Sequence, residues 1–175
     1  EVTIADSISR LEQVEVTHRC ILVIDDGSAD RTGEILAELA ARSPELVVLT
    51  RTTPQARQGK AAALNAAWTY LHGTVLAAGS RFAGWDPRQV IVTVVDADGR
   101  LSPNVGQAAV HFADPRVGGV QALVTIYNRR SFLTWAQDME FAVFGHVFQR
   151  GRSAMGTGQH GRNGQLNRLA ASTRY

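Results

Sequence analysis

Two short apolar runs, each ending at an acidic turn, constrain the fold more than any other feature of this sequence. Residues 20–24 are apolar without interruption and lead into Asp-Asp-Gly-Ser at 25–28. Residues 90–95 are apolar apart from one threonine and lead into Asp-Ala-Asp-Gly at 96–99. Runs this short and this apolar are typical of strands that are buried on both faces, as in parallel sheets. The acidic turns then follow the carboxyl ends of these strands, which is where ligands bind in such sheets.

Stretches with helical periodicity alternate with the apolar runs. The expected helices cover 2–14, from Asp30 to just before Pro44, 60–71, from Ser102 to about 114 and 132–148, with further strands at 46–49 and 117–126 and a loop at 73–87. This alternation predicts an α/β fold with a mostly parallel sheet and helices on both faces. The length suits one domain, which we expect to span residues 1–175.

The charges of the chain are nearly balanced, with 18 Lys and Arg against 16 Asp and Glu and no dense basic run. This balance argues against nucleic acid as a partner. The segment 150–168 is basic and rich in glycine, and its charge alone is explained better by a solvated loop than by a phosphate site. No stretch approaches the ~20 consecutive apolar residues that a membrane-spanning helix needs.

The second acidic turn is a candidate metal site. Asp96 and Asp98 are two residues apart, so on an extended chain they project to the same side. Two oxygens from one edge, completed by a diphosphate, suit a hard divalent cation such as Mg²⁺ or Mn²⁺. An isolated Asp-x-Asp is more often a pair of solvated loop residues. The other acidic turn at 25–28 makes the two interpretations about equally strong.

Between the two acidic turns, a glycine and a lysine begin a helical stretch. Gly59 lets the backbone approach a ligand, and the helix start with Lys60 favours an anion. The phosphate-loop pattern G-x-x-x-x-G-K-[ST] is absent. Taken alone, this motif is weak, because many surface helices begin in the same way.

Six segments, in this order, resemble those of family 2 glycosyltransferases. VIDDGSADRT at 23–32 resembles the signature VDDGSxDxT, GKAAALN at 59–65 resembles GKxxALN, and VVDADG at 94–99 resembles the Asp-x-Asp strand end. FADPRVGGVQ at 112–121 is similar to the stretch fxdpxvgxVq, while QDMEF at 137–141 and RNGQLNR at 162–168 resemble the QdxEf and GGNGQFxR elements of membrane-linked members. The ordered set covers nearly the whole chain and is far more specific than any one motif.

The resemblance implies a Rossmann-like GT-A fold and transfer of a sugar, with inversion, from a nucleoside-diphosphate sugar to an acceptor hydroxyl. UDP is the favoured nucleotide, Mg²⁺ or Mn²⁺ the implied cofactor, and a carbohydrate or lipid-linked molecule the implied acceptor. The implied roles are nucleotide contacts for Asp25, Asp26, Lys60 and Asp96, metal contacts for Asp96 and Asp98, and donor- or acceptor-sugar contacts for Asn163 and Gly164.

The chain also departs from the family pattern. The family's first strand, with its PxxNE-like turn, is expected before residue 1, and the Glu-Asp motif that carries the general base is expected beyond Tyr175. We therefore expect a partial domain, whose full-length protein is linked to a membrane and lies at its cytoplasmic face. Arg162 replaces the first glycine of the GGNGQ element.

Two other functions are compatible with some of these residues. One is a non-catalytic fragment that binds a nucleotide sugar. The other is a haloacid-dehalogenase-like phosphatase, with Asp96 as nucleophile and Asp98 as acid and base. The phosphatase is disfavoured because this motif follows the third recognisable strand and leaves the turn at 25–28 unexplained. A dinucleotide-binding fold is disfavoured because no G-x-G-x-x-G follows the first strand.

Overall fold

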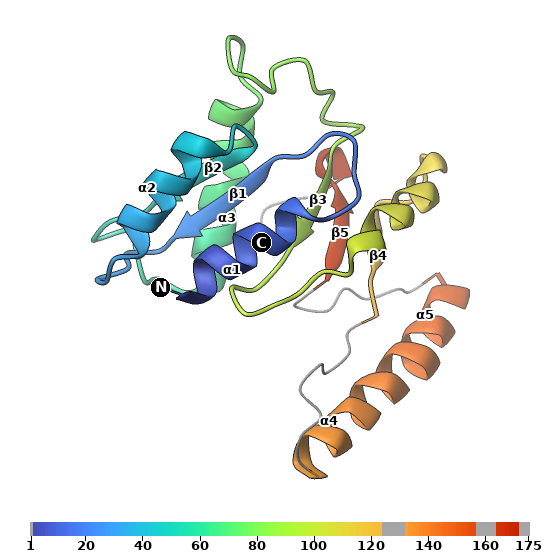
Figure 1. Cartoon of the computed structure of the whole chain (residues 1–175). Coiled ribbons are helices and arrows are strands. Elements are labelled where there is room, and N and C mark those ends of the chain that lie inside the picture. Colours follow the sequence, from blue (N-terminus) through green and yellow to red (C-terminus); the bar gives the residue numbers. More distant parts are fainter. Residues whose placement is uncertain (1, 124–131, 157–163, 172–175) are drawn as a thin grey trace.

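The computed structural model describes residues 2–123, 132–156 and 164–171 (Figure 1). Its helices and strands follow one another in an α/β order, as predicted. They are α1 (Val2–Glu12), β1 (Ile21–Asp25), α2 (Thr32–Arg42), β2 (Leu46–Thr50), α3 (Lys60–Tyr70), the π-helical η1 (Leu71–Val75), β3 (Ile91–Val94), the 3-10 helix η2 (Pro103–Ala113), β4 (Gly119–Gln121), α4 (Phe132–Val143), the π-helical η3 (Phe144–Gln149), α5 (Arg150–Ala154), β5 (Gln165–Arg168) and the 3-10 helix η4 (Leu169–Ala171).

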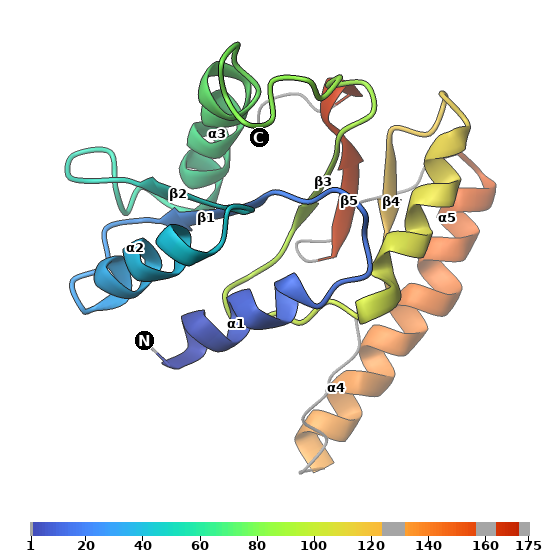
Figure 2. The ribbon, with the colours of Figure 1, turned by 45° about the horizontal axis from the view of Figure 1, so that its top comes forward.

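The first sheet is the parallel pair β1–β2, which is in register from Ile21 opposite Leu46 to Asp25 opposite Thr50. Helices α1 and α2 cover one face of this pair, and α3 lies on the other (Figure 2). The core between α1, α2 and the strands is built from four buried aliphatic side chains, Ile8, Ile21, Leu36 and Leu46. Residues two apart on a strand share a face, so Val23 and Val48 extend the same core.

The second sheet has the strand order β3–β5–β4, and the central strand β5 is antiparallel to both neighbours. Strands β3 and β4 therefore run in the same direction. We predicted a solvated loop for the segment that contains β5, and this prediction was wrong. The strand has only one apolar residue, Leu166, and its neighbour Asn167 is also buried. Its pairing is driven by two partner strands that periodicity within the segment does not show.

Other segments differ from the predictions in type or extent. The expected helix from Ser102 is a 3-10 helix, and it packs so closely on the chain after α1 that a Cβ on Gly106 would lie 2.6 Å from the Glu15 carbonyl oxygen. The expected loop at 73–87 begins inside η1 and buries Val75 and Phe82, which anchor it. The expected strand at 117–126 is described as β4 alone, and residues 124–131 lie outside the described part.

The helical segment from α4 through η3 to α5 projects away from the rest of the fold (Figures 1 and 2). The helix expected at 132–148 is present, but its large apolar side chains are exposed rather than buried. They include Trp135, Met139, Val143, Phe144, Val147 and Phe148. In the described part of the chain, no helix combines the length and the apolar character needed to span a bilayer.

Candidate functional site

The turn after β1 is held by its first aspartate. Asp25 is buried, and its Oδ1 accepts a hydrogen bond from the Ser28 backbone N–H at 2.9 Å. Gly27 has a φ of +80°, and a Cβ there would lie 3.0 Å from the Ala56 Cβ. The conformation and the lack of space both favour glycine at this position. Asp25 therefore shapes the turn, and the more exposed Asp26 is the carboxylate that this turn presents.

A buried arginine lies beside Asp26 because of the strand register. Asp25 pairs with Thr50, and the ladder continues with a hydrogen bond of 2.8 Å from the Arg51 N–H to the Asp25 carbonyl. The Arg51 side chain is 7% exposed, and its Nη1 donates to Asp26 Oδ1 at 2.5 Å. Its Nη2 donates to the Gln55 carbonyl.

The loop that follows Arg51 closes over the acidic turn and leads to α3. Arg57 donates to the Gly27 carbonyl from Nη2 at 2.6 Å and from Nε at 3.2 Å. Two residues later, Gly59 is the N-cap of α3 with a φ of +94°, and a Cβ there would meet no atom within 4 Å. The first N–H groups of a helix have no partner within the helix, so this helix start is suited to an anion. Lys60 is the only lysine in the sequence.

Lys60 joins α3 to the second acidic turn through an ion pair between its Nζ and Asp96 Oδ1. The two side chains are 45% and 41% exposed, so both remain accessible to a ligand. Strand β3 ends at Val94, and the Gly99 N–H donates to the Asp96 carbonyl at 2.8 Å. Residues 96–99 therefore form a turn. The expectation that Asp96 and Asp98 share one side of an extended chain was wrong, although the side chain of Asp98 is exposed at this turn.

Gly164 lies next to the end of β3. Its N–H donates to the Val94 carbonyl at 3.3 Å, and its own carbonyl accepts from the Ala122 N–H at 2.9 Å. Its φ of +72° again favours glycine. The predicted site residue Gly164 thus lies beside Val94, which precedes Asp96 by two residues in the chain. The other predicted sugar contact, Asn163, lies outside the described residues.

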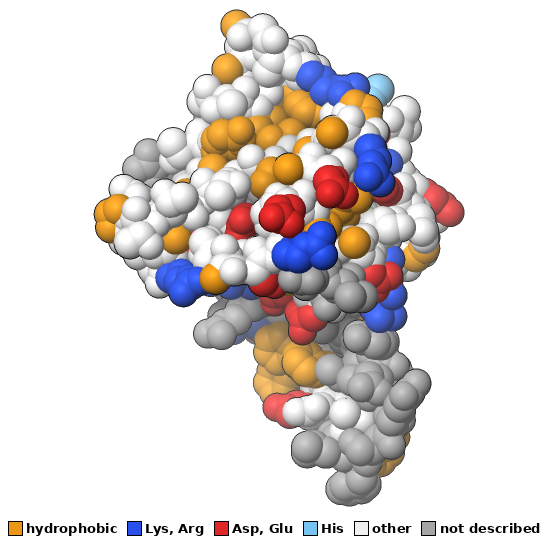
Figure 3. Space-filling view, turned by 60° about the vertical axis from the view of Figure 1, so that its left-hand side comes forward, with side chains coloured by type: hydrophobic (Ala, Val, Ile, Leu, Met, Phe, Trp, Pro, Cys, Tyr) orange, Lys and Arg blue, Asp and Glu red, His pale blue; other side chains and the backbone are white. Residues whose placement is uncertain are grey.

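Acidic and basic side chains lie next to one another across one face of the molecule (Figure 3). At the start of α2, hydrogen bonds from the Thr32 side chain and backbone N–H hold the pKa of Asp30 below its ordinary value. The sequence places the start of this helix at Asp30. The N-cap position is Arg31, and Asp30 instead accepts from the Thr32 N–H at 3.0 Å.

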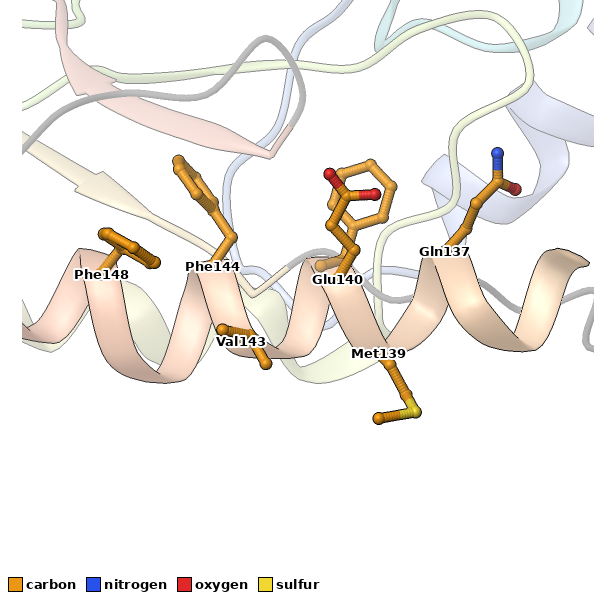
Figure 4. A pocket seen from close by; sticks show the side chains of 7 residues that line it. Gln137, Met139, Glu140, Val143, Phe144 and Phe148 are labelled. Carbon is orange, nitrogen blue, oxygen red and sulfur yellow. The ribbon is translucent and has the colours of Figure 1, made fainter.

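An apolar hollow lies on α4 and η3, and none of the predicted site residues is part of its lining. It is lined by Gln137, Met139, Glu140, Phe141, Val143, Phe144 and Phe148. Figure 4 shows that the labelled side chains all stand on one continuous helical segment. Since one segment supplies the whole lining, the hollow is an open surface.

The structure thus brings Lys60 and Asp96 into contact, and Arg57 joins the loop before Lys60 to the turn that carries Asp26. Sequence reasoning missed Arg51 and Arg57, which hold the first acidic turn in place. The signal that could have found Arg51 is its position directly after the second strand of the pair. In a parallel pair, the residue after the second strand lies beside the residue after the first.

The sequence profile described as glycosyl transferase family 2 matches residues 1–168, which include every described element of this site. The chain belongs to glycosyl transferase family 2. Its α/β fold is consistent with the GT-A type, and the predicted family is confirmed. Membership argues against the phosphatase interpretation of Asp96 and Asp98.

Three curated relatives of this family 2 domain carry the name beta-monoglucosyldiacylglycerol synthase. Those of Trichormus variabilis and a Nostoc species are each 34% identical over 154 residues, which make up 86% of this chain and 29% of the relative. That of a Synechocystis species is 31% identical over 148 residues, or 83% of this chain and 27% of the relative. The chain spans less than a third of the length of these relatives.

Replacing Gly27 by alanine tests the tightness of the acidic turn in this family 2 domain. We expect Gly27→Ala to lower the free energy of unfolding by about 1–2 kcal/mol, because alanine is strained at a positive φ. The matched control is Gly73→Ala in η1, where a Cβ meets no atom within 4 Å. The control should keep or slightly raise stability. Equal stabilities of the two variants in urea denaturation would contradict this account of the turn.

Proposed function

We propose that this domain transfers a sugar from a UDP-sugar to an acceptor hydroxyl, with inversion at the anomeric carbon and with Mg²⁺ or Mn²⁺ as cofactor. The observation that carries the proposal is the Lys60–Asp96 ion pair. This ion pair joins the start of α3 to the turn after β3. Arg57, in the loop that leads to α3, bonds to the turn after β1. Three motifs that are far apart in the sequence thus form one polar surface.

Each part of this surface suits one part of a nucleotide sugar. Asp26 offers a carboxylate oxygen to an N–H group of the base, a charge-assisted hydrogen bond. The start of α3 and the Lys60 ammonium suit the diphosphate, because both favour negative charge. Asp25 is buried and stabilises the turn, and we do not propose it as a ligand contact. Gly164, which bonds to the end of β3, lies on the side where we propose the sugar.

The implied cation fits the carboxylates of the second turn only as a partial set. Within the described residues, no three His, Cys, Asp or Glu side chains are grouped to hold a metal ion. Mg²⁺ commonly binds one or two carboxylates together with substrate phosphates and waters, and we propose Asp98 and Asp96 for that part. Bound there, the cation would neutralise charge on the departing nucleoside diphosphate. Lys60 already supplies one positive charge at this position.

The acceptor that we propose is a lipid hydroxyl. The supporting observation is that three relatives, matched over more than four fifths of this chain, carry a name that specifies diacylglycerol in their product. An enzyme that glycosylates such a lipid acts at a membrane surface, and we propose the cytoplasmic face because nucleotide sugars are the donors. A carbohydrate acceptor is the alternative outcome of the test.

The proposed reaction is tested on the full-length protein by measuring release of nucleoside diphosphate from a panel of UDP- and GDP-sugars. Diacylglycerol in mixed micelles and soluble sugars serve as alternative acceptors. We expect release from a UDP-sugar that depends on the lipid. Nucleotide binding with no acceptor-dependent release under any condition would instead favour a non-catalytic nucleotide-sugar-binding domain.

The single lysine provides a direct probe of the diphosphate position. Reductive ¹³C-methylation labels Lys60 and the N-terminal amine, which differ in chemical shift. We expect UDP to move the Lys60 signal more than uridine does, because only UDP carries the diphosphate. Identical spectra with UDP and uridine would remove Lys60 from the diphosphate site.

The role of Asp98 is tested by calorimetry with UDP in the presence and absence of Mn²⁺. The unaltered protein should bind UDP more tightly with the metal, and Asp98→Ala should lose that increment. Asp86→Ala is the matched control, since Asp86 is an aspartate of the 73–87 segment paired with Arg88. If Mn²⁺ changes UDP affinity in neither the unaltered protein nor Asp98→Ala, the metal role is wrong.

A further inference from the structure

Arg51 is a charged group that the proposed chemistry does not use, yet it is among the most buried polar residues of the described chain. Its side chain is 7% exposed, whereas that of its partner Asp26 is 30% exposed. Burying a guanidinium is costly unless it is paired and hydrogen-bonded. Here Nη1 donates to the Asp26 carboxylate and Nη2 to the Gln55 carbonyl. The cation is therefore compensated by the very carboxylate that the acidic turn presents outward.

The contact occupies one oxygen of Asp26 and leaves the other. Within the described residues, the hydrogen bond that Asp26 accepts comes from Arg51 at Oδ1, over 2.5 Å. The planar guanidinium is a rigid fork, so anchoring it at the Gln55 carbonyl also fixes the direction from which it reaches Asp26. Carboxylate rotation is thereby restricted, and Oδ2 is the acceptor that remains for a ligand.

We propose that Arg51 is the residue that sets nucleobase selectivity, by holding the Asp26 carboxylate so that its Oδ2, a hydrogen-bond acceptor, stays directed at the base. This inference rests on the proposed function. Uracil offers an N3–H donor, and an ionised carboxylate only accepts, so the two are complementary. Cytosine offers an acceptor at N3 and is rejected by the same oxygen. Arg51 is a positioning residue, since it acts through Asp26.

The proposed orientation of Asp26 leads to a specific prediction for the Asp26→Asn variant. Its amide oxygen can still accept from Arg51, which turns the amide NH₂ group toward the base. A donor in that place opposes uracil and suits cytosine. Asp26→Asn should therefore invert the preference from UDP to CDP, and the inversion should require Arg51. In Asp26→Asn/Arg51→Gln, the amide is free to rotate and the preference should vanish.

The experiment measures the dissociation constants of UDP and CDP by calorimetry on the purified protein. We expect the unaltered protein to favour UDP by about tenfold or more, as one charge-assisted hydrogen bond allows. Arg51→Gln should lower the CDP-to-UDP ratio of dissociation constants toward one. Arg51→Lys should retain part of it, because the ammonium keeps the charge without the fork. Thermal unfolding with circular dichroism identifies which variants are folded.

Arg57→Gln is the matched control, because Arg57 bonds the backbone of the same turn rather than the carboxylate. It should weaken both nucleotides in equal proportion and leave the ratio unchanged. The inference is overturned if folded Arg51→Gln and Arg51→Lys keep the full ratio, or if Arg57→Gln lowers it equally. If both Arg51 variants unfold, retention of UDP preference by Asp26→Asn overturns it. Binding of UDP and CDP with equal affinity by the unaltered protein overturns this inference alone, whereas binding of neither overturns the proposed function as well.

Discussion

The register of the parallel pair β1–β2 is the constraint on which the candidate site depends. Parallel strands end at the same edge, and the pairing of Asp25 with Thr50 fixes which residues meet there. Asp26 and Arg51 are the next residues along each strand, so the hydrogen bonds of the sheet bring a carboxylate and a guanidinium together. The register is held in turn by the aliphatic core beneath it, from Ile8 to Leu46. If one strand slipped by one residue, its core-facing side chains would turn to the opposite face of the sheet.

The features that could be predicted from the sequence are those that a local pattern of residues indicates. Strands β1, β2 and β3 were predicted because each is a short apolar run, and Asp26 and Asp96 because each follows one. Strand β5 was missed because its strand conformation depends on pairing with β3 and β4, and the segment itself has one apolar residue, Leu166. Arg51 was missed for a related reason. An arginine that directly follows a strand is usually exposed to solvent. The burial of Arg51 depends on parts of the chain that lie beside it only in the folded structure.

The aliphatic cluster of the described core lies in the first part of the chain, and further buried side chains such as Phe82, Phe112 and Leu169 lie outside it. The buried cluster draws on α1, β1, α2 and β2, whereas α4 and η3 leave residues such as Trp135 and Phe148 exposed. The prediction of a helix at 132–148 was correct in type, because its residues favour helix. Its large apolar side chains are nevertheless exposed in the described structure. Periodicity shows that a helix has an apolar side, but it does not show what that side packs against.

The division of the described strands into two sheets has a consequence for how a ligand would be held. Asp26 belongs to the β1–β2 sheet and Asp96 to the sheet that contains β3, and within the described strands no ladder connects the two sheets. Under the proposed function, the base is bound at the turn after β1, and the diphosphate at the start of α3 beside the turn after β3. A nucleotide would then act as a chelating ligand, whose two weakly binding halves gain affinity from their covalent link. Uridine and diphosphate added as separate molecules lack that gain.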